Sequence, residues 1–293
     1  MPPILLDIDD LPEPAYQAIL DLAWQLKRPR YVGDEYRGKT LALYFEKPSL
    51  RTRSTLEIAV AELGGHPLFL DQRFIGVGTR EPLKDVARNL GRWVTAIAAR
   101  VNDHATLEGF AEHSGRPVIN ALSDRAHPLQ ALADVLTLRE AFGDLKGLKL
   151  AWIGDGNNVL TSLAKALARE GMRVVAAIPE GYEPLEELPI EIVRDPREAV
   201  DGADAVYTDV WTSMGQEEER ARRLKDFAGY TVTLELFSAA KPTAIFMHCL
   251  PAHYGEEVEE AVVEHPRSRV FDQAENRLHA AKAVLKKLAE GGW

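Results

Sequence analysis

The sequence predicts an α/β protein with two domains. Its 293 residues are more than a single core usually holds and suit two domains. Short apolar runs alternate along the chain with segments whose apolar residues recur at helical spacing, as strands and helices do in α/β folds. Residues 145–148 mark a change of domain, and a strand–turn–helix pattern of the doubly wound type follows at 148–169.

The composition is that of an ordinary soluble globular protein, with 46% hydrophobic and 27% charged residues. The formal net charge of −10 argues against a nucleic-acid surface, which needs a basic face. No apolar run approaches the roughly 18 residues of a membrane span, and the N-terminus lacks the basic start of a secretory signal. The single cysteine, Cys249, excludes an intramolecular disulfide and fits a reducing cytoplasm.

The first half of the chain is expected to alternate strands and helices. Apolar runs at 41–45, 66–70 and 96–101 suit strands, and 117–120 is a short apolar piece. Helical spacing is found at 11–28, 56–63, 82–93 and 105–113, and a further helix is expected to begin within 126–130 and to end near 142. Residues 71–82 are expected to form a loop. In the helix at 82–93, the side chains of Val86, Leu90 and Trp93 are expected to face the core.

The most informative stretch is 41–53, where a predicted strand meets a predicted helix. Pro48 ends the strand because proline cannot donate to a ladder. Two hydroxyls and two guanidinium groups then stand at the start of the helix, namely Ser49, Arg51, Thr52 and Arg53. A helix N-terminus attracts anions and arginine matches phosphate oxygens, so a phosphate site is indicated. The alternative is that Ser49 only caps the helix and the arginines are solvated.

Three more polar residues of the first half stand out. Arg100 is near the carboxyl end of the 96–101 strand, where ligands bind in open α/β sheets; the alternative is an edge charge reaching solvent. His127 and Gln130 are three residues apart at the start of a helix and can share one face. A neutral histidine can donate to a carbonyl oxygen and a glutamine can accept from an NH2 group. Alone, such a pair is more often a capping histidine beside a surface glutamine.

The second half opens with a turn that resembles a dinucleotide-binding turn but lacks its third glycine, because Val159 occupies that position. Asn158 is either a helix N-cap or a ligand donor, and its position favours the cap. Further strands are expected at 173–178, 190–193, 203–210 and 244–247, with a charged helical segment at 217–227 and a C-terminal helix from 272 to 289.

Two strand ends of this half carry reactive groups. Asp209 is followed by a hydroxyl at Ser213 and by a glycine, which suits an ammonium ligand; the alternative is an Asx turn. Cys249 follows a strand and precedes a turn held by proline, which favours a pocket position over a simple core position. Arg277, near the start of the last helix, is either an anion donor or an exposed helix charge.

Taken in order, these motifs resemble the ornithine branch of the aspartate/ornithine carbamoyltransferase family. The resemblance covers nearly the whole chain, and its most specific parts are Ser213-Met-Gly215 and His248-Cys-Leu-Pro251. Two positions depart from the family pattern. Leu50 replaces a threonine of the phosphate loop, and Gly76 replaces a polar residue that commonly reaches the phosphate of a neighbouring subunit, for which Thr79 or Arg80 could substitute.

The resemblance implies two Rossmann-like domains with central parallel sheets, joined by two interdomain helices. The domains would be 1–126 with the C-terminal helix 275–293, which binds carbamoyl phosphate, and 127–274, which binds L-ornithine. The reaction implied is carbamoyl transfer to the ornithine δ-amine, giving L-citrulline and phosphate in arginine biosynthesis. It implies a cytoplasmic homotrimer or a multiple of trimers, with no cofactor, metal, nucleic acid or membrane involved.

The resemblance also assigns residues to roles. Those implied for carbamoyl phosphate are Ser49, Leu50, Arg51, Thr52, Arg53, Arg100, His127, Gln130, Cys249, Leu250 and Arg277. Those implied for ornithine are Asn158, Asp209, Ser213 and Met214. The catalytic set implied is Arg100, His127, Asp209, Cys249 and Arg277.

Three other interpretations compete with an ornithine-directed carbamoyltransferase. A carbamoyltransferase for another amine, such as putrescine or an acylated ornithine, is disfavoured by Asp209 with the Ser213-Met-Gly215 segment. An inactive relative that binds carbamoyl phosphate or partner proteins is supported only by Leu50 and Gly76. A nucleotide-binding oxidoreductase is disfavoured by the missing third glycine at Val159.

Overall fold

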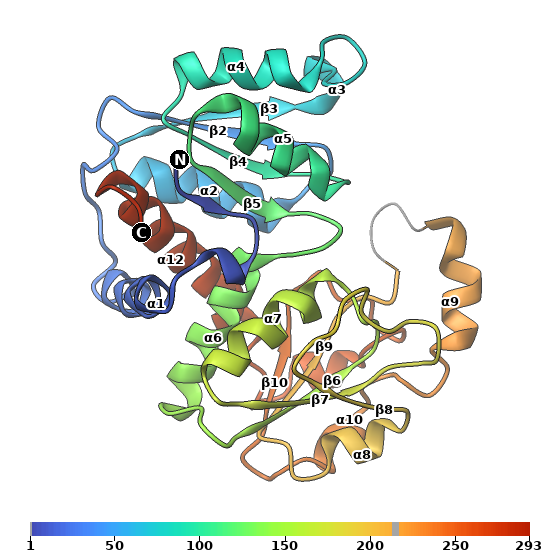
Figure 1. The fold of residues 1–293 in the computed structure, drawn as a ribbon. Helices are drawn as coiled ribbons and strands as arrows, with labels where there is room; N and C mark the ends of the chain where they lie inside the picture. Colours follow the sequence, from blue (N-terminus) through green and yellow to red (C-terminus); the bar gives the residue numbers. More distant parts are fainter. Residues whose placement is uncertain (1, 213–216) are drawn as a thin grey trace. The chain divides into compact units, whose positions relative to one another are not determined.

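The chain consists of two compact units, each built on one five-stranded sheet (Figure 1). The computed structural model describes residues 2–212 and 217–293. The first unit comprises Met1–Leu136 and Glu275–Trp293, and the second comprises Thr137–Ala274. All strand pairs in both sheets are parallel, so the predicted α/β class with two central parallel sheets is confirmed.

The chain passes from one unit to the other twice, each time inside a helix. The first passage is in α6 (Pro128–Phe142), between Leu136 and Thr137. This is ten residues later than the expected domain start at 127, because the first turns of α6 bond to the first unit, as Gln130 does to Arg277. The second passage is in α12 (Val270–Ala289), between Ala274 and Glu275.

The first sheet has the strand order β1-β5-β4-β2-β3. Its strands are β1 (Ile4–Leu5), β2 (Thr40–Phe45), β3 (His66–Asp71), β4 (Ala96–Arg100) and β5 (Val118–Leu122). Figure 1 shows α4 on one side of this sheet and α2 on the other. Because the sheet is covered on both faces, central strands read as continuous apolar runs, and every residue of β4 is buried.

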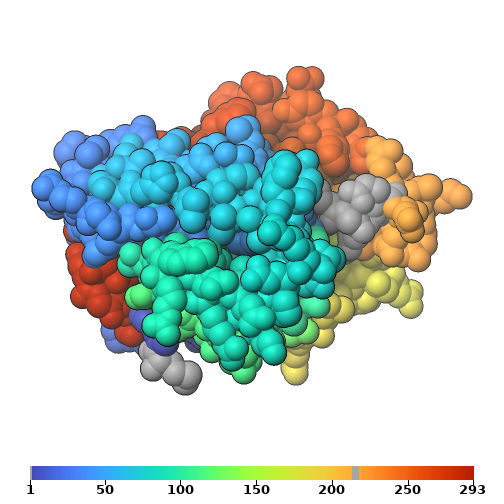
Figure 2. All heavy atoms as spheres, turned by 90° about the horizontal axis from the view of Figure 1, so that it is seen from above, coloured from blue at the N-terminus to red at the C-terminus, as the bar shows by residue number. Residues whose placement is uncertain are grey.

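The helices of the first unit are α1 (Glu13–Lys27), α2 (Leu50–Glu62), α3 (Gln72–Ile75), α4 (Leu83–Trp93) and α5 (His104–Ser114), preceded by a short 3-10 turn at Ile8–Asp10. Residues of α4 and α5 pack with β2 and β4 in one core, and both helices form surface in Figure 2 (teal to green). The expectation for Trp93 was wrong. It is 70% exposed because it ends α4, and Val94 takes the buried place.

Three elements of this unit were not expected, the 3-10 turn at Ile8–Asp10, β1 and α3. The two-residue strand β1 exists only through its pairing with β5, in which Ile4 pairs with Val118. The short helix α3 lies within the expected loop 71–82, capped by Asp71, and ends at Gly76 with a φ of 70°. A side chain at Gly76 would be strained in this left-handed conformation.

The second sheet has the strand order β10-β9-β6-β7-β8. Its strands are β6 (Lys149–Ile153), β7 (Arg173–Ala177), β8 (Glu191–Val193), β9 (Ala205–Thr208) and β10 (Ile245–His248). Its helices are α7 (Asn158–Arg169), α8 (Pro196–Val200), α9 (Arg220–Asp226), α10 (Leu234–Ser238) and α11 (Glu260–Val263), with a 3-10 turn at Glu217–Glu219. No described helix combines the length and the apolar character that a membrane span requires.

Strand register decides which loops lie together. In the first sheet Phe45 pairs with Arg100, so the loop after β2 and the end of β4 share one edge. In the second sheet Thr208 pairs with both Ile153 and His248, so the loops after β6, β9 and β10 also share one edge. These are the carboxyl edges, where parallel sheets place their ligands.

Candidate active site

The start of α2 is suited to an anion. Ser49 is the N-cap of this helix, and its hydroxyl accepts from the backbone N–H of Thr52 at 3.2 Å. The first turn of α2 contains no acidic side chain, so its partial positive charge is not offset locally. Both sequence readings of Ser49 therefore fit one geometry, because a cap that orders the turn also presents the remaining backbone N–H groups to an anion.

Two buried guanidinium groups meet at the hydroxyl of Thr52. Arg100 Nη1 donates to Thr52 Oγ1 at 3.4 Å, and Arg277 Nη2 donates to the same oxygen at 3.1 Å. All three residues are at most 7% exposed. Two like charges that share one neutral oxygen in a buried place need an anion nearby to offset their repulsion and desolvation. Arg277 is therefore an inward-facing donor and not an exposed helix charge.

Gln130 is held in one orientation from both ends of its amide. Its Oε1 accepts from Arg277 Nη1, and its Nε2 donates to Asp134 Oδ1 at 2.7 Å. Asp134 is fully buried and was not predicted from the sequence, although its position four residues after Gln130 on α6 was the available signal. The amide oxygen of Gln130 is thereby directed to the side of Arg277 and keeps a second lone pair for a ligand.

His127 lies close enough to these arginines to respond to their charges. Burial, and then the charges of Arg277 and Arg100, hold the pKa of His127 well below its usual value. The imidazole is therefore neutral at physiological pH and has one N–H to donate. A neutral donor of this kind is suited to a carbonyl oxygen, as the sequence suggested.

The other phosphate-loop residues lie differently. Leu50 is 76% exposed, and Arg51 is partly buried in the first turn of α2. Arg53 donates to Glu57 at 2.8 Å and lies over the ring of Phe69, with 3.6 Å between the guanidinium carbon and the ring centroid. Consecutive helix residues point about 100° apart, so the structure does not bring Arg53 to Thr52.

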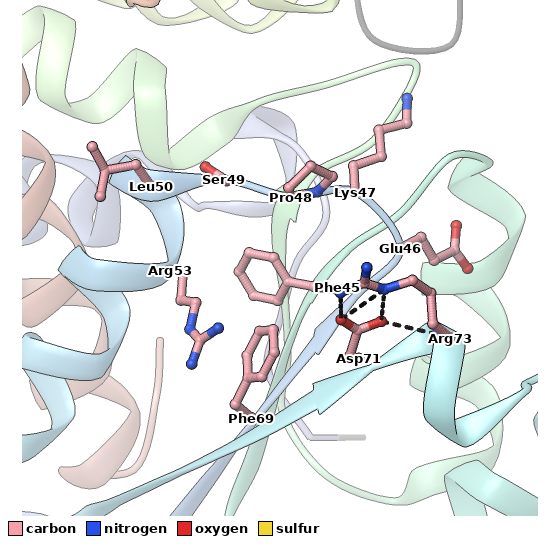
Figure 3. A pocket seen from close by; sticks show the side chains of 10 residues that line it. All are labelled: Phe45, Glu46, Lys47, Pro48, Ser49, Leu50, Arg53, Phe69, Asp71 and Arg73. Carbon is pink, nitrogen blue, oxygen red and sulfur yellow. Dashed lines mark hydrogen bonds and ion pairs between the residues drawn. The ribbon is translucent and has the colours of Figure 1, made fainter.

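Arg53 instead lines a pocket of about 380 Å³ beside the loop that follows β2 (Figure 3). The rings of Phe45 and Phe69 lie side by side in it, and Arg73 pairs with Asp71 at its rim. The remaining lining residues are Glu46, Lys47, Pro48, Ser49 and Leu50. Within the first unit, the pocket is therefore lined both by the phosphate loop and by the apolar rings of Phe45 and Phe69.

In the second unit, Asp209 accepts two hydrogen bonds at a strand end. Cys249 Sγ donates to its Oδ1 at 2.9 Å, and Asn157 Nδ2 donates to its Oδ2 at 2.8 Å. Asp209 is 6% exposed. A carboxylate that accepts two hydrogen bonds still has acceptor capacity for a further donor, so it suits an ammonium group.

The cap of α7 is Asn157, so the preferred expectation for Asn158 was wrong. The Asn157 side chain accepts from the backbone N–H groups of Val159 and Leu160, whereas Asn158 is the first helical residue. A cap must precede the helix with extended backbone, and Asn157 has that conformation. Asn157 was missed as a site residue, and adjacent asparagines cannot be distinguished by spacing alone.

The loop after β10 has an unusual backbone. Leu250 has a φ of 56°, a left-handed conformation that costs roughly 1–2 kcal/mol for a residue with a side chain. Its N–H donates to Nδ1 of the fully buried His248 at 2.8 Å. His248 Nε2 lies 3.2 Å from Oε1 of Glu257, which is also fully buried and was not predicted.

Within residues 2–212 and 217–293, two groups of side chains lie close enough to consider a metal ion: Asp209 with His248 and Cys249, and His253 with Glu256 and Glu257. In the first group, both ring nitrogens of His248 already have partners, Leu250 and Glu257. In the second, Glu257 Oε1 already accepts from His248 and from the His253 backbone. These contacts hold the loop that follows β10.

Ser213 and Met214 lie outside the described residues. Within each unit, the structure brings several predicted residues together. In the first unit these are Ser49, Thr52, Arg100, His127, Gln130 and Arg277, and in the second they are Asp209, Cys249 and Leu250. One cluster is cationic and the other is built around a carboxylate.

Comparison with known proteins gives a consistent result. Residues 4–140 match the family described as "Aspartate/ornithine carbamoyltransferase, carbamoyl-P binding domain", and residues 146–288 match its "Asp/Orn binding domain". The chain is 59% identical over 292 residues to an ornithine carbamoyltransferase of Thermus thermophilus, with 98% of this chain and 97% of the relative covered.

Solved structures agree with this. A crystal structure of ornithine carbamoyltransferase from Thermus thermophilus superposes with a TM-score of 0.92 at 56% identity, covering 98% of this chain and 99% of that one. The Pyrococcus furiosus enzyme gives 0.93 at 46% identity, covering 98% and 97%. An N-acetyl-L-ornithine transcarbamylase mutant also superposes, with a TM-score of 0.87 at 29% identity, covering 96% and 98%. The fold alone therefore does not distinguish these amines.

Proposed function

We propose that this chain, which belongs to the aspartate/ornithine carbamoyltransferase family, transfers the carbamoyl group of carbamoyl phosphate to the δ-amine of L-ornithine. The products are L-citrulline and phosphate. The observation that carries the proposal is the meeting of Arg100 and Arg277 at Thr52 Oγ1, beside a helix N-terminus. Buried positive charge at such a place is suited to binding the phosphate group of an acyl phosphate.

In the first unit, the phosphate is held by the start of α2. The backbone N–H groups after Ser49, the side chains of Arg51 and Thr52, and the guanidinium of Arg100 are its donors. Arg53 would have to leave Glu57 and Phe69 to join them. Leu50 contributes only its backbone N–H, because its side chain is 76% exposed.

The carbonyl oxygen gains negative charge as the amine attacks, and donors fixed in advance stabilise that charge. Thr52 Oγ1 accepts from both arginines, so its own hydrogen is available to the carbonyl oxygen. Neutral His127 donates its N–H, and Arg100 and Arg277 add their charges. Gln130 Oε1 and the Leu250 carbonyl accept from the carbamoyl NH2 group.

In the second unit, Asp209 binds an ammonium group of ornithine, assisted by Asn158, Ser213 and the backbone of Met214. The attacking amine is an ordinary alkylammonium in water, with a pKa of about 10, and only its neutral form attacks. The nitrogen bonds to the carbonyl carbon, the carbon–oxygen bond to phosphate breaks, and the departing phosphate takes the proton that the amine nitrogen loses. Cys249 donates to Asp209 and forms no covalent intermediate.

The test measures citrulline formation from carbamoyl phosphate and L-ornithine, with putrescine and N-acetylornithine run at equal concentration. We expect turnover on ornithine alone. If the protein turned over only putrescine or only N-acetylornithine, that amine would replace ornithine as the assigned substrate. No turnover on any amine, with carbamoyl phosphate still bound, would support the inactive relative and point to Leu50 and Gly76 first.

We further propose that the protein works in arginine biosynthesis in the cytoplasm, as a homotrimer or a multiple of trimers. The support is the similarity to ornithine carbamoyltransferases along nearly the whole chain. Light scattering of the purified protein at two concentrations tests the assembly. A monomeric mass with full turnover would contradict it.

A further inference from the structure

The loop that follows β10 is held at both ends by two buried side chains, those of His248 and Glu257. His248 and Glu257 are each 0% exposed. His248 is the last residue of β10, and its backbone N–H donates to Gln273 Oε1 at 3.0 Å. This hydrogen bond fixes the backbone from which the imidazole ring extends. Gln273 Nε2 in turn donates to the hydroxyl of Tyr207 in the neighbouring strand β9 at 2.8 Å.

The hydrogen bonds of His248 determine its tautomer. Nδ1 accepts from the Leu250 N–H at 2.8 Å, so Nδ1 carries no hydrogen. The hydrogen of the ring is then on Nε2, which donates to Glu257 Oε1 at 3.2 Å. The carboxylate of Glu257 therefore maintains the ring as an acceptor toward Leu250, as carboxylates do for histidines that must present one defined nitrogen.

Glu257 also reaches the far end of the loop. Its Oε1 accepts from the His253 backbone N–H at 2.6 Å. Leu250 is connected to the end of β10 by His248 Nδ1 itself, and residue 253 is connected to it through this one carboxylate oxygen. The connection spans the residue with the left-handed backbone, Leu250, and begins next to Cys249, which donates to Asp209.

We propose that His248 and Glu257 are positioning residues that set the Leu250 carbonyl and the Cys249 thiol for carbamoyl transfer. This inference rests on the proposed function, in which that carbonyl accepts from the carbamoyl group. Neither residue touches the substrate. Their effect passes through the hydrogen bond from the Leu250 N–H to His248 Nδ1. This bond fixes the peptide plane before Leu250, and the direction of the Leu250 carbonyl depends on that plane.

Two substitutions at His248 separate the positioning role from simple packing. The amide oxygen of His248→Asn can take the place of Nδ1 as an acceptor for the Leu250 N–H. The amide of His248→Gln takes the place of Nε2 and leaves that N–H without its acceptor. Because His248→Asn removes the Nε2 donor of Glu257, we combine it with Glu257→Gln, so that no buried carboxylate is left without its donor. The matched control is His265→Gln, because His265 Nδ1 accepts from the Arg267 N–H at 3.1 Å, the same spacing of two residues.

The measurements are kcat and KM for citrulline formation, inorganic phosphate affinity by calorimetry, and the thermal melting temperature. We expect His248→Gln to lower kcat about 100-fold, the loss typical of a misplaced reacting group. The phosphate affinity should stay within about 2-fold of the unchanged protein. The double variant should retain at least a third of kcat, and His265→Gln should match the unchanged protein.

A second route keeps the proposal testable if His248→Gln does not fold. Glu257→Leu removes the acceptor that maintains the tautomer, and it should lower kcat with the same pattern in KM and phosphate affinity. Equal kcat in His248→Gln and the unchanged protein, or equal losses in His248→Gln and the double variant, would overturn the positioning role alone. An unchanged protein that makes no citrulline would overturn the proposed function, and the inference with it.

Discussion

Replacing Thr52 by valine removes the one oxygen at which the two buried arginines of the first unit meet. Valine has nearly the shape of threonine, so the helix α2 and its packing should persist. What disappears is an acceptor for Arg277 Nη2 at 3.1 Å and for Arg100 Nη1 at 3.4 Å. The hydroxyl hydrogen that we assign to the carbonyl oxygen is lost as well.

The size of the effect follows from these distances. The contact at 3.4 Å is long for a hydrogen bond and should contribute little. The bond at 3.1 Å involves a charged donor, and such bonds contribute about 1.5–3 kcal/mol. Because about 1.4 kcal/mol corresponds to a tenfold change, kcat/KM for carbamoyl phosphate should fall by about 10- to 150-fold.

The assay is citrulline formation at saturating ornithine and varied carbamoyl phosphate. Thr55→Val is the matched control, since Thr55 lies one turn further along α2 and its hydroxyl donates only to backbone oxygens, of Arg51 at 2.7 Å and of Thr52 at 3.3 Å. Thr52→Ser, which retains the hydroxyl, should recover most of the activity. If Thr52→Val and Thr55→Val both kept more than half of kcat/KM, the assignment of Thr52 would be refuted.

Four further outcomes are expected. Since the folded-state pKa of His127 is depressed, its neutral form persists as pH falls through 6.5. The kcat/KM for carbamoyl phosphate should therefore show no break near pH 6.5, while the rate with ornithine falls steadily toward acid. A break near pH 6.5 would contradict the role of His127 as a neutral donor. Cys249→Ser should retain measurable turnover because serine can still donate to Asp209; complete loss in a folded protein would favour a covalent role. Asn157→Asp should retain the helix cap but raise the KM for ornithine, because two carboxylates would then oppose each other; an unchanged KM at unchanged melting temperature would remove Asn157 from the site. Leu50→Thr should alter phosphate affinity less than about 3-fold, as surface substitutions do, and a tenfold gain would show that the missing hydroxyl matters.

Much of the first unit was predictable because its signals are local. The apolar run before Pro48 became β2, Ser49 became the cap of α2, and Pro128 began α6. Each of these depends on residues within one turn or one strand. The failures were also local in origin. Trp93 continued a helical apolar pattern but lies at the exposed end of α4, where periodicity does not report burial.

The site residues that were missed share a different cause. Asp134 and Glu257 are buried acids whose partners, Gln130 and His248, were identified, but a buried acid in a sequence looks like any other acid. Asn157 differs from the predicted Asn158 by one position, and the difference depends on where the helix begins. Arg53, which a motif places beside Thr52, lies over Phe69 because β3 supplies a ring there.

By itself, the sequence determined the α/β class, the order of most strands and helices, and the residue types of the proposed substrate sites. Only the tertiary structure decided which of those residues meet. Arg277 bonds to Gln130 and Thr52, which are 147 and 225 positions away, and this depends on α12 returning to the first unit. Helical spacing and caps are set within a few residues, whereas contacts between distant buried charges are set by strand order and chain return, which no local pattern records.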